Sequence, residues 1–376
     1  MTIRSIGVEE EMYLVDPRTA WPIPRSEGVQ EVDDDRDDDA PQDVTQELFL
    51  EQVETTTDPA QDLATLRAHV VEARLRAAAD AQAVGAALLP SPTPVAGRPQ
   101  HVTPHERYRW MADRHCDLFP AVAVCGMHVH VDVEDDEEAV RVIDRLGPWL
   151  PVVTALSAGS PFSEGADTGF ASWRARQWDR WPTAGPTEPF GDLATYRREV
   201  EAAVASGVAI DDGMVYLDAR VGRATPTVEV RVMDVQLDVD DAVAFAGLVR
   251  SLVTTVAEVP DLPGWSVARL RTARWLAQRD GVTGRLIHPV DGTPVPAAEA
   301  VEALLDAVDD ALGAAGDRTL VRSHVDALLA DGGAAGRARR VAAGDPQRWA
   351  DHVVERTRQS LATARVETSE SGTSSA

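Results

Sequence analysis

Three segments of the chain each carry two charged or imidazole side chains at positions i and i+2. These pairs are Glu9 and Glu11, His128 and His130, and Glu229 and Arg231. Apolar and β-branched residues flank every pair, which predicts strands, and on a strand such positions share one face. Two carboxylates that are buried side by side repel each other, so a nearby cation must neutralise them. The spacing therefore predicts a polar site to which several strands contribute.

Each pair alone is also typical of an ordinary structural role. The glutamates could form an exposed acidic edge, the histidines could be hydrogen-bonded core or surface groups, and the third pair could be a buried salt bridge. The joint pattern favours a divalent cation, because hard cations prefer oxygen ligands. Several carboxylates with few imidazoles favour Mg²⁺ or Mn²⁺ over structural zinc. Such ions can hold the phosphates of a nucleotide while a phosphoryl group moves.

A further strand, expected at residues 46–57, adds Glu51 and Glu54 to the candidate residues. Because these two glutamates are three positions apart, they face opposite sides of an ideal strand. Three threonines follow Glu54, and we expect Glu54 to be the one that faces the site.

The composition excludes several classes of function. The chain has 376 residues, a formal net charge of −26 and no lysine. A surface this acidic repels phosphate backbones and anionic lipids, so neither nucleic acid nor a membrane is an expected partner. The absence of lysine excludes a lysine-bearing phosphate loop and a lysine Schiff base. Arginine remains, and its planar guanidinium group clamps carboxylates and phosphates well.

The sequence also predicts a cytoplasmic location. Its N-terminus lacks the apolar core of a signal peptide, and no segment reaches the roughly 18 apolar residues of a membrane span. The two cysteines, Cys116 and Cys125, are too few for a disulfide framework.

The order of the expected elements predicts an α+β fold. Strands are expected at residues 3–15, 46–57, 85–95, 120–133, 213–220 and 226–235. Helices are expected at residues 60–84, 136–158, 239–258, 264–279, 296–313, 317–330 and 346–364. Short connections between strands favour antiparallel pairing over a doubly wound sheet. The chain then continues as a helical C-terminal region.

Two stretches are expected to be loops within one domain at residues 1–364. Residues 31–43 are a block of acids, which we interpret as a solvated loop because it lacks the glycine spacing of a calcium loop. Residues 159–191 are rich in glycine, proline and tryptophan, and loops of that length are usually functional. Residues 365–376 are expected to be a polar tail.

Six segments of the chain resemble the second family of glutamate–cysteine ligases, the bacterial carboxylate–amine ligases. They are residues 7–12 (GVEEEM), 126–131 (GMHVHV), 157–162, 167–172, 227–234 (TVEVRVMD) and 240–244. The three strand motifs are also similar to those of glutamine synthetase. The resemblance implies a glutamine synthetase/guanido kinase-like catalytic fold, in which a curved, mainly antiparallel sheet packed by helices binds ATP and metal ions on its concave face.

The resemblance also implies residue roles. The implied ligands of Mg²⁺ or Mn²⁺ are Glu9, Glu11, Glu54, His128 and Glu229. The implied phosphate or acyl-phosphate contacts are His130 and Arg231. Arg220 would bind a substrate carboxylate or phosphate, and Arg174 and Arg176 in the long loop would be further phosphate contacts.

The expected reaction is an ATP-dependent ligation of the γ-carboxylate of L-glutamate to the amine of L-cysteine through an acyl phosphate. Its substrates are small molecules, and a homodimer is compatible with the sequence. Two alternatives stay open at this point. One is a metal-dependent hydrolase or cupin-like enzyme that uses the His-x-His strand, and the other is a non-catalytic relative that binds nucleotide or amino acid.

Overall fold

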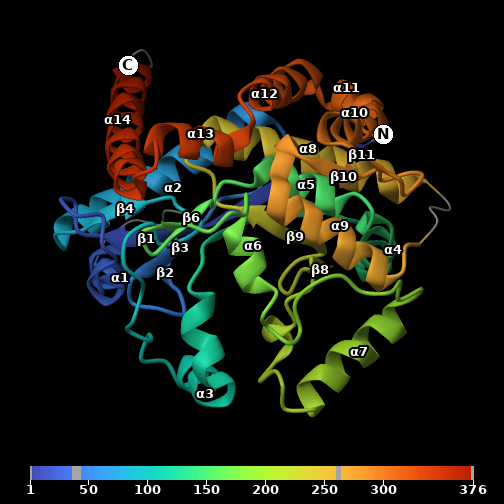
Figure 1. Cartoon of the computed structure of the whole chain (residues 1–376), viewed down its shortest axis with the longest axis horizontal. Helices are drawn as coiled ribbons and strands as arrows, with labels where there is room; N and C mark the ends of the chain where they lie inside the picture. Colours follow the sequence, from blue (N-terminus) through green and yellow to red (C-terminus); the bar gives the residue numbers. More distant parts are fainter. Residues whose placement is uncertain (1, 36–43, 260–263, 374–376) are drawn as a thin grey trace.

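A seven-stranded antiparallel sheet forms the centre of the molecule (Figure 1). The computed structural model describes residues 2–35, 44–259 and 264–373. The strand order is β2-β3-β1-β5-β9-β8, and β4 also pairs with β1. The strands are β1 (Ile6–Val15), β2 (Val44–Gln46), β3 (Gln52–Thr56), β4 (Ala87–Leu89), β5 (Gly126–Asp132), β8 (Ala219–Val221) and β9 (Thr227–Asp234). Every pairing in this sheet is antiparallel, which confirms the predicted α+β class.

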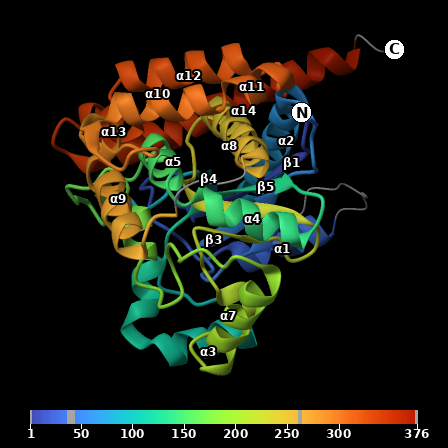
Figure 2. The same cartoon turned by 90° about the vertical axis from the view of Figure 1, so that its right-hand side faces the viewer.

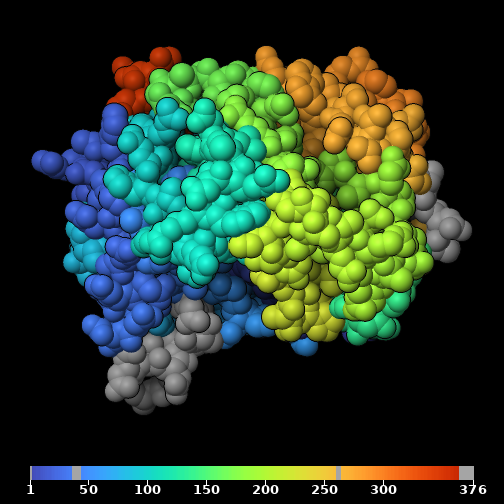
Figure 3. Space-filling view, turned by 90° about the horizontal axis from the view of Figure 1, so that it is seen from below, coloured from blue at the N-terminus to red at the C-terminus, as the bar shows by residue number. Residues whose placement is uncertain are grey.

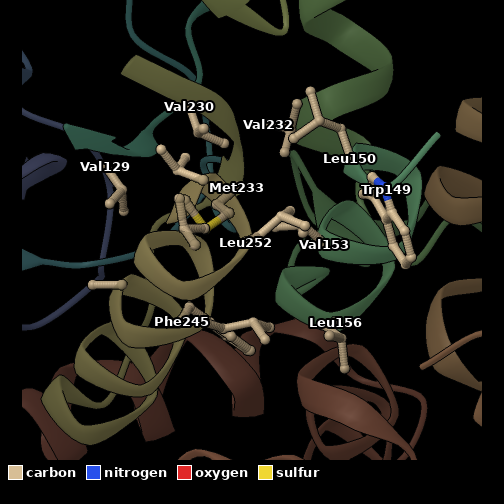
Figure 4. Close-up of a cluster of buried hydrophobic side chains, with 14 of the residues drawn as sticks. Val129, Trp149, Leu150, Val153, Leu156, Val230, Val232, Met233, Phe245 and Leu252 are labelled. Carbon is tan, nitrogen blue, oxygen red and sulfur yellow. The ribbon is translucent and has the colours of Figure 1, made fainter. Parts of the chain in front are cut away.

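Helices cover one face of the sheet and bury the apolar residues of its strands. The helices nearest the sheet are α2 (Leu63–Ala83), α4 (Asp136–Leu146), α5 (Leu150–Ser157) and α8 (Val239–Glu258). Alternation along β1 turns Ile6 and Val8 toward this layer, and Met127 and Val129 of β5 do the same. In Figure 4, side chains of β9 lie beside Leu252 of α8 and the residues of α5, in one buried cluster that also contains Phe245.

More helices follow in the sequence and pack around this layer, and one of them, α14, also contacts β4. They are α9 (Val267–Asp280), α10 (Ala297–Ala307), α11 (Asp309–Ala315), α12 (Arg318–Ala330), α13 (Gly333–Ala342) and α14 (Pro346–Thr373). Figures 1 and 2 both show α10, α11 and α12 stacked above α8. None of the helices in the described ranges is long and apolar enough to cross a membrane.

The opposite face of the sheet is covered only in part, by shorter segments. They are the helices α3 (Glu106–His115), α6 (Trp173–Trp178) and α7 (Leu193–Ala205) with the 3-10 turns η1 (Cys116–Val122) and η2 (Asp212–Met214). Figure 3, seen from below, shows the segments of α3 and α7 side by side on this face. These segments form the walls of the site described below. Elsewhere lie α1 (Ser26–Asp34), the turn η3 (Gly281–Thr283), and the short pairs β6 (Phe162–Ser163) with β7 (Ala166–Asp167) and β10 (Arg285–Ile287) with β11 (Pro294–Pro296).

Several predicted elements need correction. Residues 31–34 of the expected acidic loop belong to α1, and residues 36–43 lie outside the described ranges. The expected loop at 159–191 contains α6 and the β6–β7 hairpin. The expected strand at 120–133 begins only at Gly126, because the preceding apolar residues form η1. The helix α14 continues to Thr373, into the expected polar tail.

Candidate active site

The strand register brings the three predicted pairs together on the face away from α8. Residues that lie opposite each other on neighbouring strands are Glu9 and His128, His130 and Glu229, and Glu11 and Glu54. Opposite positions in an antiparallel pair hold their side chains about 5 Å apart. The register therefore builds one continuous polar surface from four strands.

This surface is the floor of a cavity of about 700 Å³. Its ionisable lining includes Glu9, Glu11, Glu47, Glu54, His128, His130, Glu229, Arg107, Arg220, Arg223 and Arg231. Its aromatic lining is Tyr108, Trp178 and Tyr216. We call Glu9, Glu11, Glu47, Glu54 and His128 the acidic cluster, and Arg107, Arg220, Arg223 and Arg231 the arginine side. A cavity with these two parts can hold an anion and the cations that accompany it.

Glu9 lies between the two histidines of β5. Its Oε2 is 3.0 Å from Nδ1 of His128, and its Oε1 is 3.0 Å from Nε2 of His130. Burial raises the pKa of Glu9, but the hydrogen bonds of the two imidazoles outweigh burial and lower it. Burial and the nearby Arg231 lower the pKa of His128. The lowered pKa favours the neutral imidazole, which is the form that binds a metal ion.

Glu229 lies between two guanidinium groups. Nε and Nη2 of Arg220 donate to its two carboxylate oxygens at 2.5 and 3.1 Å, and Arg231 donates to it from the other side. Burial raises the pKa of Glu229, but the charges of Arg231 and Arg220 outweigh burial and lower it to about 2. Glu229 is thus ionised, and it fixes the two arginines beside the cavity.

The pKa values of Glu47 and Glu54 are shifted in the opposite direction from those of Glu9 and Glu229. Burial and the carboxylate of Glu11 raise the pKa of Glu47 to about 8. Burial and the carboxylate of Glu9 raise the pKa of Glu54 well above its usual range. The surroundings therefore do not compensate the negative charge that the acidic cluster would carry with all its carboxylates ionised.

The acidic cluster fits a divalent cation. Three overlapping groups of residues offer ligand atoms within 4.8 Å of one another: Glu9 with His130 and Glu229, Glu9 with Glu54 and His128, and Glu11 with Glu47 and Glu54. Nε2 of His128 is buried without a hydrogen-bond partner. An orphaned imidazole nitrogen beside mutually repelling carboxylates is what a hard cation would satisfy.

Not every predicted residue lies in the cavity. Arg174 is buried away from it, and Arg176 pairs with Asp179 at 3.0 Å; neither is among the lining residues. Glu51 faces the other way, as expected, and its carboxylate is 2.7 Å from Nδ1 of His101. The predicted phosphate contacts in the long loop are therefore not brought to this site.

Sequence reasoning also missed lining residues. Glu47 was included in the strand expected at residues 46–57, but it lies in an irregular segment before β3, so strand spacing could not show that it faces the site. Arg107 and Tyr108 belong to α3, a helix that we did not predict. Arg107 forms an ion pair with Asp211 beside η2, which joins the two walls of the cavity. The only available signal was the run of arginines and aromatic residues at 107–110.

The hydrolase or cupin-like alternative loses its support here. Such sites usually need a third histidine close to the His-x-His pair. Among the described residues that line the cavity, His128 and His130 are the only histidines. The ligand set around them consists of carboxylates.

Comparisons with known proteins agree with this geometry. The profile described as Glutamate-cysteine ligase family 2 matches residues 5–359. A Streptomyces avermitilis protein named "Putative glutamate--cysteine ligase 2-1" is 44% identical over 344 residues, which cover 89% of this chain and 93% of that protein. A Streptomyces coelicolor protein with a name of the same form is 44% identical over 341 residues, covering 89% of this chain and 93% of that protein.

A solved structure shares the fold. Glutamate–cysteine ligase from Francisella tularensis, in complex with AMP, matches with a TM-score of 0.73 at 11% identity, covering 97% of this chain and 89% of that chain. The fold, the site and the sequence matches together define an ATP-dependent ligase that forms a carbon–nitrogen bond. The chain belongs to glutamate–cysteine ligase family 2.

Proposed function

We propose that this protein joins the γ-carboxylate of L-glutamate to the amine of L-cysteine through an acyl phosphate, at the expense of ATP. The observation that carries the proposal is the single cavity in which the acidic cluster and the arginine side meet, in a chain of this family. A carboxylate is a poor electrophile, so phosphorylation must supply a leaving group. An enzyme for this reaction mainly positions its reactants and stabilises charge.

The arginine side binds the anionic groups of the reactants. Arg231 and His130 contact the phosphoryl group as the γ-carboxylate oxygen of glutamate attacks it and ADP leaves. Arg220, held by Glu229, binds a substrate carboxylate or phosphate. These groups are fixed before the substrates arrive, so they stabilise charge without reorganising.

The acidic cluster would hold the metal ions. Mg²⁺ or Mn²⁺ bound to Glu9, Glu11, Glu54, His128 and Glu229, with Glu47 beside them, would neutralise the charge of the nucleotide phosphates. The chain's own contribution is to gather these ligands at fixed positions on a rigid sheet. The AMP bound in the Francisella tularensis structure supports nucleotide binding by a protein of this fold.

The second half of the reaction takes place at the acyl carbon. The amine nitrogen attacks this carbon, inorganic phosphate leaves and the amine loses a proton. Tyr108, Trp178 and Tyr216 give one wall an aromatic surface, against which the side chain of the acceptor amino acid can pack. The shape of this wall is expected to decide which amine reacts.

The test is ADP formation with ATP, Mg²⁺ and glutamate held constant and the acceptor amino acid varied. Cysteine is expected to give the highest rate, and a Glu229→Gln variant serves as the inactive control. Binding of Mg·ATP without ADP formation with any amine would instead favour the non-catalytic relative. A cytoplasmic homodimer is part of the same proposal, and its mass in solution can be measured by light scattering.

A further inference from the structure

Arg174 is buried where α6 meets the sheet, close to the start of β5. Its side chain is 2% exposed. The guanidinium group packs so tightly against Gly126 that a Cβ on that residue would lie 2.1 Å from Nη2 of Arg174. Any side chain at position 126 would displace the guanidinium group. Gly126 is therefore required for the present position of Arg174.

The neighbouring strand β9 contains a β-bulge where Arg231 turns toward the cavity. The register between β5 and β9 shifts between Met127 and Val129. Arg231 and Val232 consequently lie together opposite His128. A bulge takes one residue out of the regular ladder and redirects its side chain. The direction of the Arg231 side chain thus depends on the geometry of the bulge.

Groups outside the β5–β9 ladder bind both backbone polar groups of Arg231. Its N–H donates to the carbonyl of Asp218 at 3.0 Å. Its carbonyl accepts a hydrogen bond from Nη1 of Arg174 at 3.1 Å. Buried backbone groups without a partner are costly, so these two contacts stabilise the bulge.

The backbone of Arg174 is itself anchored to the end of β9. The carboxylate of Asp234 accepts hydrogen bonds from the hydroxyls of Ser160 and Ser172 at 2.7 and 2.8 Å. Oγ of Ser160 accepts from the N–H of Arg174 at 3.0 Å, and Oγ of Ser172 caps α6 by accepting from Ala175. The start of α6 and the end of β9 therefore form one rigid unit.

We propose that Arg174 is a positioning residue: its guanidinium group holds the carbonyl of Arg231 at the bulge and thereby aims the Arg231 side chain at the transferred phosphoryl group. This inference rests on the proposed ligase function. Arg174 does not line the cavity, so it acts through Arg231 and not on a substrate.

The test is a double-mutant cycle of Arg174→Met and Arg231→Met. A misplaced group costs up to about 100-fold in rate, so Arg174→Met should lower kcat for ADP formation by about 10- to 100-fold with a much smaller change in KM for ATP. In the Arg231→Met background it should cost little more, because coupled residues are not additive. Arg180→Met, at an exposed arginine just after α6, is the matched control and should leave kcat unchanged.

The proposal is overturned if the effects of the two single substitutions multiply, or if Arg174→Met behaves like Arg180→Met. Should Arg174→Met fail to fold, Arg174→Lys takes its place in the cycle with the same expected non-additivity. For the same four proteins, the shift in thermal midpoint on adding Mg·ATP is measured as a second quantity. That second measurement tests the coupling between Arg174 and Arg231 without turnover. If no amine gives ADP, the proposed function fails, but the positioning role of Arg174 is still tested.

Discussion

Glu9 and Glu10 are neighbours in the sequence but face opposite sides of β1. Glu9 faces the cavity and contacts both histidines of β5. Glu10 faces the helical layer, where its two carboxylate oxygens accept hydrogen bonds from Arg74 of α2 at 2.8 and 2.6 Å. The same residue type therefore contributes to the site at position 9 and to the stability of the fold at position 10.

Glu9→Gln should abolish most activity and leave the fold intact. The substitution keeps the shape of the side chain and removes the charge that binds a cation. Loss of one such charge-stabilising group typically costs at least about 100-fold in kcat. ADP release and a thermal melt of the same sample check this, and full turnover in the variant would remove Glu9 from the site.

Glu10→Ala should have the reverse effect. Removing one partner of a buried ion pair leaves the other charge uncompensated, which costs about 3–5 kcal/mol of unfolding free energy. Urea denaturation measures this loss. Protein that remains folded should keep its kcat, and a stability equal to that of the parent would contradict the role of the Arg74 pair.

Glu47→Gln should stabilise the protein without metal and weaken its response to Mg²⁺. The pKa of Glu47 is raised to about 8 by burial and by Glu11, so its ionised form is disfavoured where it lies. In EDTA the thermal midpoint should rise by about 1 °C, which corresponds to about 1 kcal/mol for a chain of this size. Mg²⁺ should then raise it less than in the parent; an unchanged Mg²⁺ response would place Glu47 outside the cation site.

At the scale of elements, an ion pair joins α12 to the first turn of α8. Nε2 of His324 contacts the carboxylate of Asp241. This hydrogen bond raises the pKa of His324, against partial burial, and Asp240 adds to the increase while Arg337 opposes it. Protonated His324 therefore stabilises the folded state.

This contribution has a defined dependence on pH. Because the pKa is raised on folding, the stabilisation is fully present below the unfolded value of about 6.5 and is lost as pH rises through the folded value. His324→Gln should therefore cost about 0.5–1 kcal/mol at pH 6 and almost nothing at pH 9, since the pair is partly solvated. Urea midpoints at the two values of pH measure it, and equal losses would contradict the charge-based account.

The elements that the sequence predicted best are those with strong periodicity. α8 is buried along most of its length, and β1 and β9 alternate between core and cavity. α7 was missed because Leu193 is its only buried residue, so it has almost no apolar stripe. Residues 120–125 resemble a strand, but Phe119 and Val122 pack in a separate aromatic cluster, and tertiary packing there overrides the local pattern.

At the scale of the whole molecule, the net charge of −26 opposes the approach of anionic substrates. Salt screens this repulsion, because the Debye length falls from about 30 Å at 0.01 M to about 8 Å at 0.15 M. We expect kcat/KM for ATP at saturating Mg²⁺ to rise about two- to tenfold over this range. KM for a zwitterionic acceptor amino acid is the control and should change little. A fall in kcat/KM for ATP would show that the arginine side dominates the electrostatic potential at the cavity.

The sequence could predict the floor of the site but not its walls. Spacing within a strand identifies Glu9, Glu11, His128 and Glu229, because a strand fixes which side chains share a face. Arg107 comes from α3, whose position depends on packing far along the chain, including the ion pair with Asp211. Arg174 shows the same limit. The sequence singled it out as a candidate residue, but only the structure shows that it is buried against Gly126.

Of the nine tryptophans in the chain, Trp178 is the one that lines the cavity. It is almost fully buried, and the guanidinium carbon of Arg174 lies 5.6 Å from its ring centroid. Indole fluorescence responds to nearby charge and to displaced water. The emission spectrum of the unlabelled protein should therefore report occupancy of the site, and Trp178→Phe would identify the part of the signal that comes from this indole.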